Sequence, residues 1–185
     1  MWNLPNLLTL LRILLIPLLA LVFYLPWEWR HPVSAAVFGL AALTDWFDGY
    51  LARRLDQMTP FGAFLDPVAD KLIVAVALIM LLETHPSVLF AVATMVIIGR
   101  EIVVSALREW MAEMGKRTSV AVSYLGKVKT TVQMIAIVAL LLINPEKYPL
   151  LDAVGVALLY VAAGLTLWSM CIYLAAAWPE LKKET

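Results

Sequence analysis

The residues best suited to chemistry are four aspartates in one short stretch of a very hydrophobic chain. Asp45 and Asp48 are three residues apart, and Asp66 and Asp70 are four residues apart. On two helices joined by a short turn, each pair lies on one helix face, so all four carboxylates can converge. Clustered carboxylates repel one another, and burial beside a bilayer disfavours their charged forms. Because hard oxygen ligands suit Mg²⁺ or Mn²⁺, the stretch predicts a divalent metal site.

Small residues and an arginine accompany these acids. Gly49 and Ala52 belong to the segment of the first acid pair, and Gly62 precedes the second pair by one turn. Small residues in membrane helices commonly allow close helix packing, and that interpretation stays open here. Beside four acids and a cation, they equally allow a phosphate-bearing ligand to approach. Arg53 lies four residues after Gly49, on the same helix face, and can pair with a phosphate that metal ions also bind.

The composition indicates an integral membrane protein. Of 185 residues, 63% are hydrophobic, and the mean hydropathy of +0.86 lies far outside the range of soluble domains. Basic and acidic residues number 14 each, so the net charge does not indicate a nucleic-acid partner. The first 24 residues lack the basic start and the small-residue cleavage pattern of a signal peptide.

Six apolar segments are long enough to cross a hydrocarbon core as helices, which takes about 20 residues. Their continuous apolar runs, without period-two alternation, favour helices over barrel strands. No internal repeat or soluble domain is visible, so residues 1–185 are expected to form a single all-α, polytopic membrane domain. The expected segments are Leu7–Leu25, Val33–Leu55, Phe64–Leu82, Val88–Met111, Val122–Ile143 and Leu151–Ala177.

The distribution of basic residues predicts the orientation in the membrane. Loops on one side hold only Arg30 and Lys147, whereas the loops on the other side and the C-terminal tail carry most of the lysines and arginines. The positive-inside rule therefore places both termini and the Asp45–Asp70 turn on the cytoplasmic side. His31 and His85 fall on the opposite side and are expected to be interfacial loop residues.

The depth in the membrane at which the acids are expected distinguishes a transporter from an enzyme. A transporter usually has its ionisable residues near the bilayer centre, in broken helices related by a repeat. Here the acids gather at one leaflet, where a water-soluble molecule arrives from the cytoplasm and a lipid head group arrives from the membrane. The pattern favours an enzyme that acts on lipid head groups, and a metal-ion transporter stays open as the alternative from another class.

The acid stretch resembles the signature of the CDP-alcohol phosphotransferases, Asp-x2-Asp-Gly-x2-Ala-Arg-x8-Gly-x3-Asp-x3-Asp, with every fixed position and gap present. The resemblance implies a membrane enzyme with six transmembrane helices, commonly a homodimer. Such enzymes use divalent metal, here two Mg²⁺ or Mn²⁺ ions, to displace CMP from a CDP-linked lipid or alcohol by an incoming hydroxyl. The implied roles are metal binding by Asp45, Asp48, Asp66 and Asp70, general base catalysis by Asp70, and lining of the CDP site by Gly49, Ala52 and Arg53.

Further stretches resemble the bacterial phosphatidylglycerophosphate synthases within that family. They are Asn3–Arg12, Gly99–Glu113, Gly115–Arg117 and Gly126–Thr131. The resemblance therefore covers most of Asn3–Met134, while the last two apolar segments look generic. A second basic residue often found near the N-terminus is absent, which bears on orientation and not on chemistry. This resemblance implies that CDP-diacylglycerol and sn-glycerol 3-phosphate react to phosphatidylglycerophosphate and CMP at the bacterial cytoplasmic membrane, among membrane lipids.

An anionic acceptor needs cations near the metal site. Arg108 and Lys127 either bind the acceptor phosphate or serve as snorkelling, positive-inside residues at the cytoplasmic face. An unpaired arginine inside a bilayer costs at least about 2.5–3.5 kcal/mol. Arg100 is therefore expected to pair either with a protein acid, such as Glu101 of a neighbour, or with the substrate.

Two further questions stay open at the level of sequence. Asn6 and Thr9 either hydrogen-bond the cytidine or its phosphates, or cap a helix near the interface. The acceptor is sn-glycerol 3-phosphate on resemblance alone, since serine, inositol phosphate or a second phosphatidylglycerol is compatible with the same acid signature.

Overall fold

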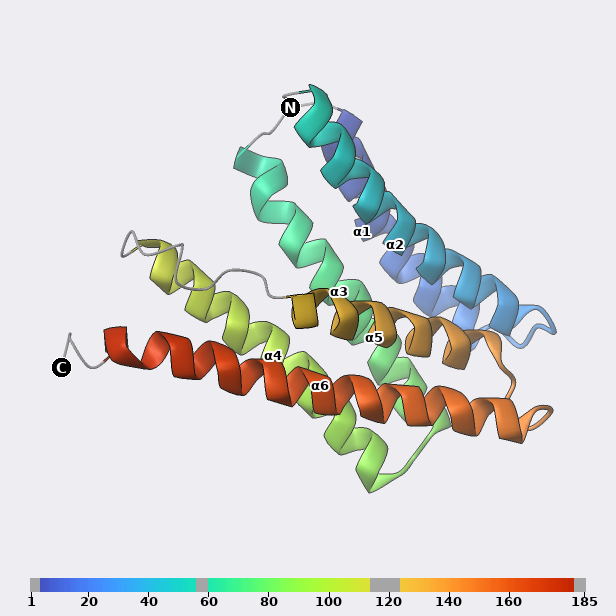
Figure 1. Ribbon diagram of the computed structural model, residues 1–185. Coiled ribbons are helices and arrows are strands. Elements are labelled where there is room, and N and C mark those ends of the chain that lie inside the picture. The colour runs from blue at the N-terminus through green and yellow to red at the C-terminus, as the bar shows by residue number, and fades with distance from the viewer. Residues whose placement is uncertain (1–3, 56–59, 114–123, 182–185) are drawn as a thin grey trace. The chain divides into compact units, whose positions relative to one another are not determined.

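The computed structural model describes residues 4–55, 60–113 and 124–181, and within these ranges it leaves out some side chains, notably those of residues 45–55 and 124–127. The described residues form helices and turns without any strand, which confirms the all-α prediction (Figure 1). The helices are α1 (Leu4–Tyr24), α2 (Arg30–Leu55), α3 (Pro60–Thr84), α4 (Val88–Glu113), α5 (Tyr124–Leu142) and α6 (Pro149–Leu181).

Each predicted apolar segment corresponds to one helix, and the differences lie at the ends. The third helix begins at Pro60 and not at Phe64, because a proline suits the first helical turn, where no backbone N–H is needed. It then continues through Pro67, and α1 continues through Pro17. An interior proline removes one backbone hydrogen bond, a loss that packed membrane helices tolerate.

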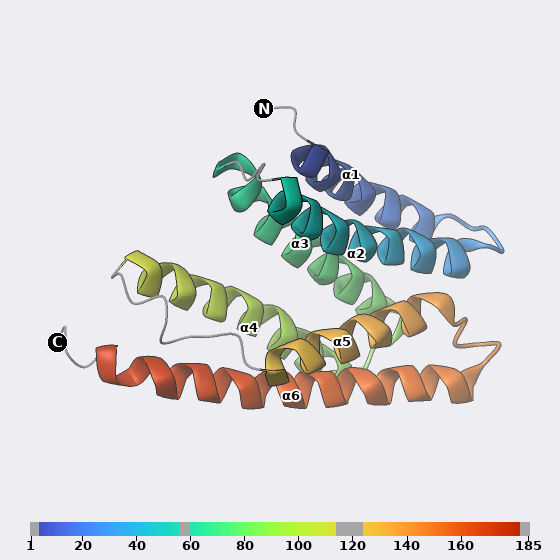
Figure 2. The same ribbon diagram turned by 45° about the horizontal axis from the view of Figure 1, so that its top comes forward.

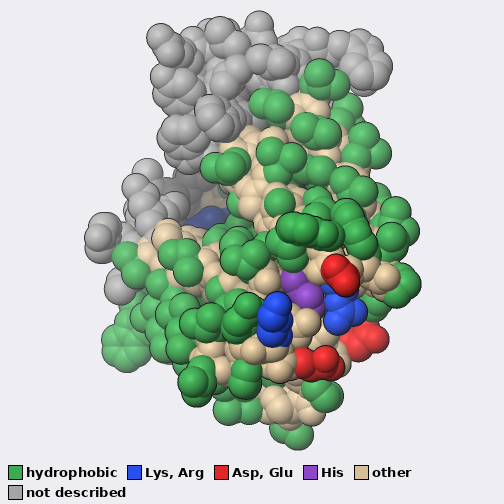
Figure 3. Space-filling model, turned by 90° about the vertical axis from the view of Figure 1, so that its right-hand side faces the viewer, with side chains coloured by type: hydrophobic (Ala, Val, Ile, Leu, Met, Phe, Trp, Pro, Cys, Tyr) green, Lys and Arg blue, Asp and Glu red, His purple; other side chains and the backbone are tan. Residues whose placement is uncertain are grey.

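Among the described residues, three helices are long and apolar enough to cross a membrane, over Asn6–Tyr24, Val88–Glu113 and Pro149–Ala175. Val128–Leu142 is a shorter apolar part of α5. Large apolar side chains on these helices are exposed, among them Leu14 at 67% and Val88 at 84%. In one view, hydrophobic side chains cover most of the described surface, and the few charged ones gather in a small area (Figure 3). Such a surface indicates a membrane protein. That α2 and α3 also span the membrane stays a prediction.

The contacts divide the chain into two compact units. The first contains residues 1–85 and 137–152, and the second contains residues 86–136 and 153–185. In the first unit, α1 packs along α2 and against α3, and α1 and α2 lie side by side in both ribbon views (Figures 1 and 2). Ala41, Ala69 and Ala77 are fully buried there beside Leu19 and Phe38. Small residues at these positions let the helix backbones approach closely, and this packing sets α1 against the acid-bearing start of α3.

A polar contact ties the end of α3 to the start of α6 within the first unit. His85 directly follows α3, and its Nε2 lies 3.0 and 3.1 Å from the two carboxylate oxygens of Asp152. Asp152 sits in the first turn of α6, where a negative charge interacts favourably with the helix dipole. His31 is the second residue of α2 and is buried, with Nδ1 3.3 Å from the Leu141 carbonyl oxygen. The prediction of a loop residue is therefore wrong for His31, because α2 begins three residues earlier than expected.

We expect Asp152→Asn to lower the free energy of unfolding by about 1–3 kcal/mol, the range for removing a charged partner from a mostly buried hydrogen bond. Thermal unfolding of the purified protein in detergent measures the change. Glu146→Gln is the control, because Glu146 is an exposed acid on the nearby α5–α6 connection. Equal unfolding midpoints for the two variants would show that the His85–Asp152 contact does not stabilise the fold.

Candidate active site

Two acids of α3 meet two polar residues of α1. The Thr9 hydroxyl donates a hydrogen bond to Oδ1 of Asp66. One turn further along both helices, the Arg12 guanidinium donates from Nη1 to Oδ1 of Asp70 and forms an ion pair. The spacing of three residues on α1 matches the spacing of four on α3, so both contacts form on facing helix surfaces.

Burial closes this site on one side and leaves it open on the other. The side chains of Thr9 and Arg12 are completely buried, whereas the side chain of Asp70 is 42% exposed and Asp66 is partly buried. A buried arginine is tolerated only when it is paired, and Asp70 supplies the opposite charge. The Asp66 and Asp70 carboxylates therefore contact α1 on one side and remain partly exposed.

The first acid pair is located only by its backbone. Asp45 and Asp48 belong to α2 and, three residues apart on a helix, share one face. The same helix carries Gly49, Ala52 and Arg53. The side chains of these five residues lie outside the described ones, so their convergence with the α3 acids stays a prediction.

Gly62 and the polar residues near the start of α1 are described. Gly62 is buried in the first turn of α3. Asn6 is 3% exposed and Thr9 is fully buried, five residues into α1. Thr9 therefore does not cap the helix, and its contact with Asp66 connects it to the acids.

Two of the predicted acceptor-binding residues lie in the second unit. Arg100 is buried and pairs with the carboxylate of Glu101 in the same chain. Arg108 is exposed, donates to the Tyr173 hydroxyl over 3.1 Å, and has its Cζ 5.3 Å from the centre of that ring, within the range of a cation–π contact. The Lys127 side chain lies outside the described ones. That these cations reach the acids stays a prediction.

Sequence reasoning missed two buried cations. Arg12 is the only charged residue of α1, and a lone arginine in an apolar segment is a signal that could have found it. Lys129 of α5 is 2% exposed and donates to the Ser169 hydroxyl of α6 over 3.1 Å. Ser169 and Tyr173 are one turn apart, so α6 presents two hydroxyls on one face to cations from α5 and α4. The last helix, which looked generic in the sequence, thus accepts hydrogen bonds from two cations.

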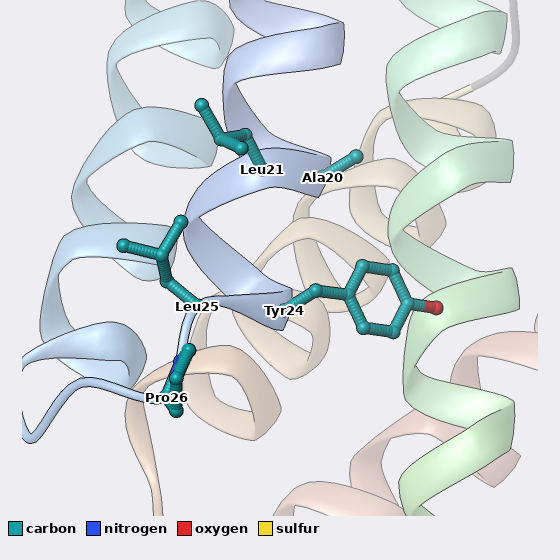
Figure 4. A pocket seen from close by; sticks show the side chains of 5 residues that line it. All are labelled: Ala20, Leu21, Tyr24, Leu25 and Pro26. Carbon is teal, nitrogen blue, oxygen red and sulfur yellow. The ribbon is translucent and has the colours of Figure 1, made fainter.

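A hollow at the other end of α1 is unsuited to phosphate chemistry. It is lined by Ala20, Leu21, Tyr24, Leu25 and Pro26 (Figure 4). Its one polar group, the Tyr24 hydroxyl, donates to Oε2 of Glu83 over 2.6 Å. Without a cation in its lining, this apolar hollow offers no binding group for a diphosphate.

Comparison with known proteins identifies the family. Residues 2–168 match the family model of CDP-alcohol phosphatidyltransferase. The chain belongs to this family. The match confirms the resemblance of the acid signature and extends through α5 and far into α6, beyond the stretches that carried the resemblance.

Two bacterial relatives illustrate the similarity, and both are named CDP-diacylglycerol–glycerol-3-phosphate 3-phosphatidyltransferase. The Pseudomonas fluorescens protein is 56% identical over 183 residues, which cover 98% of this chain and 93% of the relative. The protein of Salmonella choleraesuis (strain SC-B67) is 57% identical over 180 residues, which cover 97% of each chain.

We expect Ser169→Ala to destabilise the protein by about 1–3 kcal/mol, because it leaves the buried Lys129 ammonium without its hydrogen-bond acceptor. In a Lys129→Met background the same change should cost much less, since no buried charge remains. Thermal unfolding of the two single variants and the double variant measures this coupling. Purely additive effects would mean that the Lys129–Ser169 contact contributes nothing to stability.

Proposed function

We propose that this protein transfers the phosphatidyl group of CDP-diacylglycerol to sn-glycerol 3-phosphate, giving phosphatidylglycerophosphate and CMP. The observation that carries the proposal is the complete acid signature on α2 and α3, in a chain 56–57% identical over nearly its whole length to relatives named for this transfer. The apolar helices fit a lipid substrate that stays in the membrane.

Divalent metal is the cofactor that the family implies, and the described donors fit it. Asp66 and Asp70 offer hard carboxylate oxygens one turn apart, at a site that is partly exposed. With Asp45 and Asp48 they would hold Mg²⁺ or Mn²⁺, as two ions. When bound, the metal neutralises the diphosphate and stabilises the charge that builds on the leaving CMP.

The chain's own residues would bind the substrates and move one proton. Asp70 accepts the proton of the 1-hydroxyl of sn-glycerol 3-phosphate as that oxygen attacks the phosphorus of the phosphatidyl group. The new P–O bond forms as the bond to CMP breaks, and CMP leaves with the bonding electrons. Arg53 holds the diphosphate, and Gly49, Ala52 and Gly62 allow its close approach.

Binding of the acceptor is assigned to cations of the second unit. Arg108 and Lys127 bind its phosphate, and Arg100 supports them from its pair with Glu101. Asn6, buried near the start of α1, is assigned to cytidine or its phosphates. The proposed setting is a homodimer in the bacterial cytoplasmic membrane, with both termini and the acids on the cytoplasmic side, where the soluble acceptor is found.

We expect Asp70→Asn to lower the rate of CMP release by at least about 100-fold, because a general base contributes roughly that much or more. The assay uses purified protein in lipid vesicles with CDP-diacylglycerol and sn-glycerol 3-phosphate, and Mn²⁺ binding is measured on the same sample. Glu83→Gln, at an exposed acid near the other end of α3, is the control and should stay close to the original rate. Undiminished activity of the metal-bound Asp70→Asn variant at neutral pH would remove Asp70 as the base.

The acceptor and the metal are tested together by offering one acceptor at a time. We expect sn-glycerol 3-phosphate to give the fastest CMP release, with serine and inositol phosphate far slower. A chelator should stop the reaction, and added Mg²⁺ or Mn²⁺ should restore it. Faster release with another acceptor would change the substrate but keep the reaction class. Cation flux into the vesicles, without metal-dependent CMP release from any acceptor, would replace the enzyme with a transporter.

A further inference from the structure

We propose that α1 is the positioning element of the acid site, in which Arg12 orients Asp70 and Thr9 orients Asp66 for divalent metal. The inference rests on the proposed function, because it assigns a purpose to the same acids. Neither contact follows from the acid signature, since the partners are 57 and 58 residues apart in the chain.

Burial of the Arg12 guanidinium in α1 requires a favourable partner, because removing a charge from water costs free energy. Arg12 is the only charge in α1, and its side chain is completely buried. An apolar residue of similar size would pack there without any desolvation penalty, and replacing a buried ion pair by apolar residues is often neutral or stabilising. A guanidinium at this position is therefore better explained by its partner, Asp70, than by packing.

The Thr9–Asp66 and Arg12–Asp70 contacts follow one another in register along α1 and α3. Thr9 and Arg12 lie on one face of α1, and each meets the acid opposite it on α3. Between the two acids, Ala69 is fully buried, and a small residue there is compatible with close helix packing. One contact alone would be a local hydrogen bond, whereas two in succession fix the orientation of both carboxylates relative to α1.

The two contacts leave both acids partly exposed. Both involve Oδ1 of the acid, and a carboxylate has two oxygens with several acceptor sites. Asp70 also keeps 42% of its side chain exposed. Outer partners that hold ligating carboxylates in this way typically change metal affinity or activity by about 10–100-fold when removed. Arg12 and Thr9 are therefore positioning residues, and they need not touch the substrate.

The test uses Mn²⁺ alone, titrated into the purified protein and followed by the loss of the free-ion electron paramagnetic resonance signal. We expect Thr9→Val, which keeps the shape and removes the hydroxyl, to weaken Mn²⁺ binding by about 10-fold or more. Thr9→Ser should restore it. Thr94→Val is the matched control, because Thr94 is a buried threonine of α4 without a hydrogen-bond partner for its hydroxyl among the described residues.

Arg12 is tested in the same way with two replacements. Arg12→Gln should weaken Mn²⁺ binding by about 10–100-fold, and Arg12→Lys should recover part of the loss by returning the charge. Thermal unfolding without metal separates misfolding from altered affinity, and Thr9→Val keeps the proposal testable if Arg12→Gln does not fold. A folded Thr9→Val variant with unchanged affinity for Mn²⁺ would overturn the proposal. So would an Arg12→Lys variant that binds Mn²⁺ more tightly than the original protein does, or an original protein that binds no Mn²⁺.

Two readouts distinguish this proposal from the proposed function. Mn²⁺ binding is measured without CDP-diacylglycerol or acceptor, so weaker binding in the variants supports positioning whichever reaction is catalysed. If the original protein releases CMP and Thr9→Val binds Mn²⁺ normally, the function stands and the positioning role falls. If the variants bind Mn²⁺ weakly and the original protein releases no CMP, the positioning role stands and the function falls.

Discussion

The ion pair between Arg12 and Asp70 is the interaction on which the acid site depends. α1 brings one guanidinium, fully buried, against Asp70, the acid with the proposed catalytic role, and a buried charge is tolerated only with such a partner. That guanidinium reaches Asp70 because α1 packs against α3. The packing of α1 against α3 therefore also determines the electrostatics of the site, because the Arg12–Asp70 ion pair forms between these two helices.

Other buried polar groups in the described residues follow the same constraint. Arg100 pairs with Glu101, and Lys129 donates to Ser169, each inside one unit of the chain. In an apolar environment a polar side chain without a partner is costly. The Lys129–Ser169 contact joins α5 to α6, whereas Arg100 and Glu101 are neighbours on α4. Lys129 differs from the two arginines because its partner is a neutral hydroxyl.

The sequence predicted the helices well because continuous apolar runs have one structural solution in a membrane, where every backbone group must be satisfied within the segment. One error fell at a helix end: the loop assigned to His31 is part of α2. The start of α3 at Pro60 agrees with the fit of a proline to the first helical turn. The acid signature also predicted the family, which the match over residues 2–168 confirmed. The roles of Arg12 and Lys129 were missed, because a motif read along one segment does not contain the partner on another.

By itself, the sequence determined which residues are helical, which acids share a helix face, and to which family the chain belongs. These properties depend on local periodicity and on fixed spacing, which a linear pattern carries. Only the tertiary structure decided that Thr9 meets Asp66 and that Arg12 meets Asp70, almost sixty residues away. The physical reason is that periodicity defines only which side chains share a face of one helix. Which side chains they contact on a second helix depends on the register and the distance at which the two helices pack.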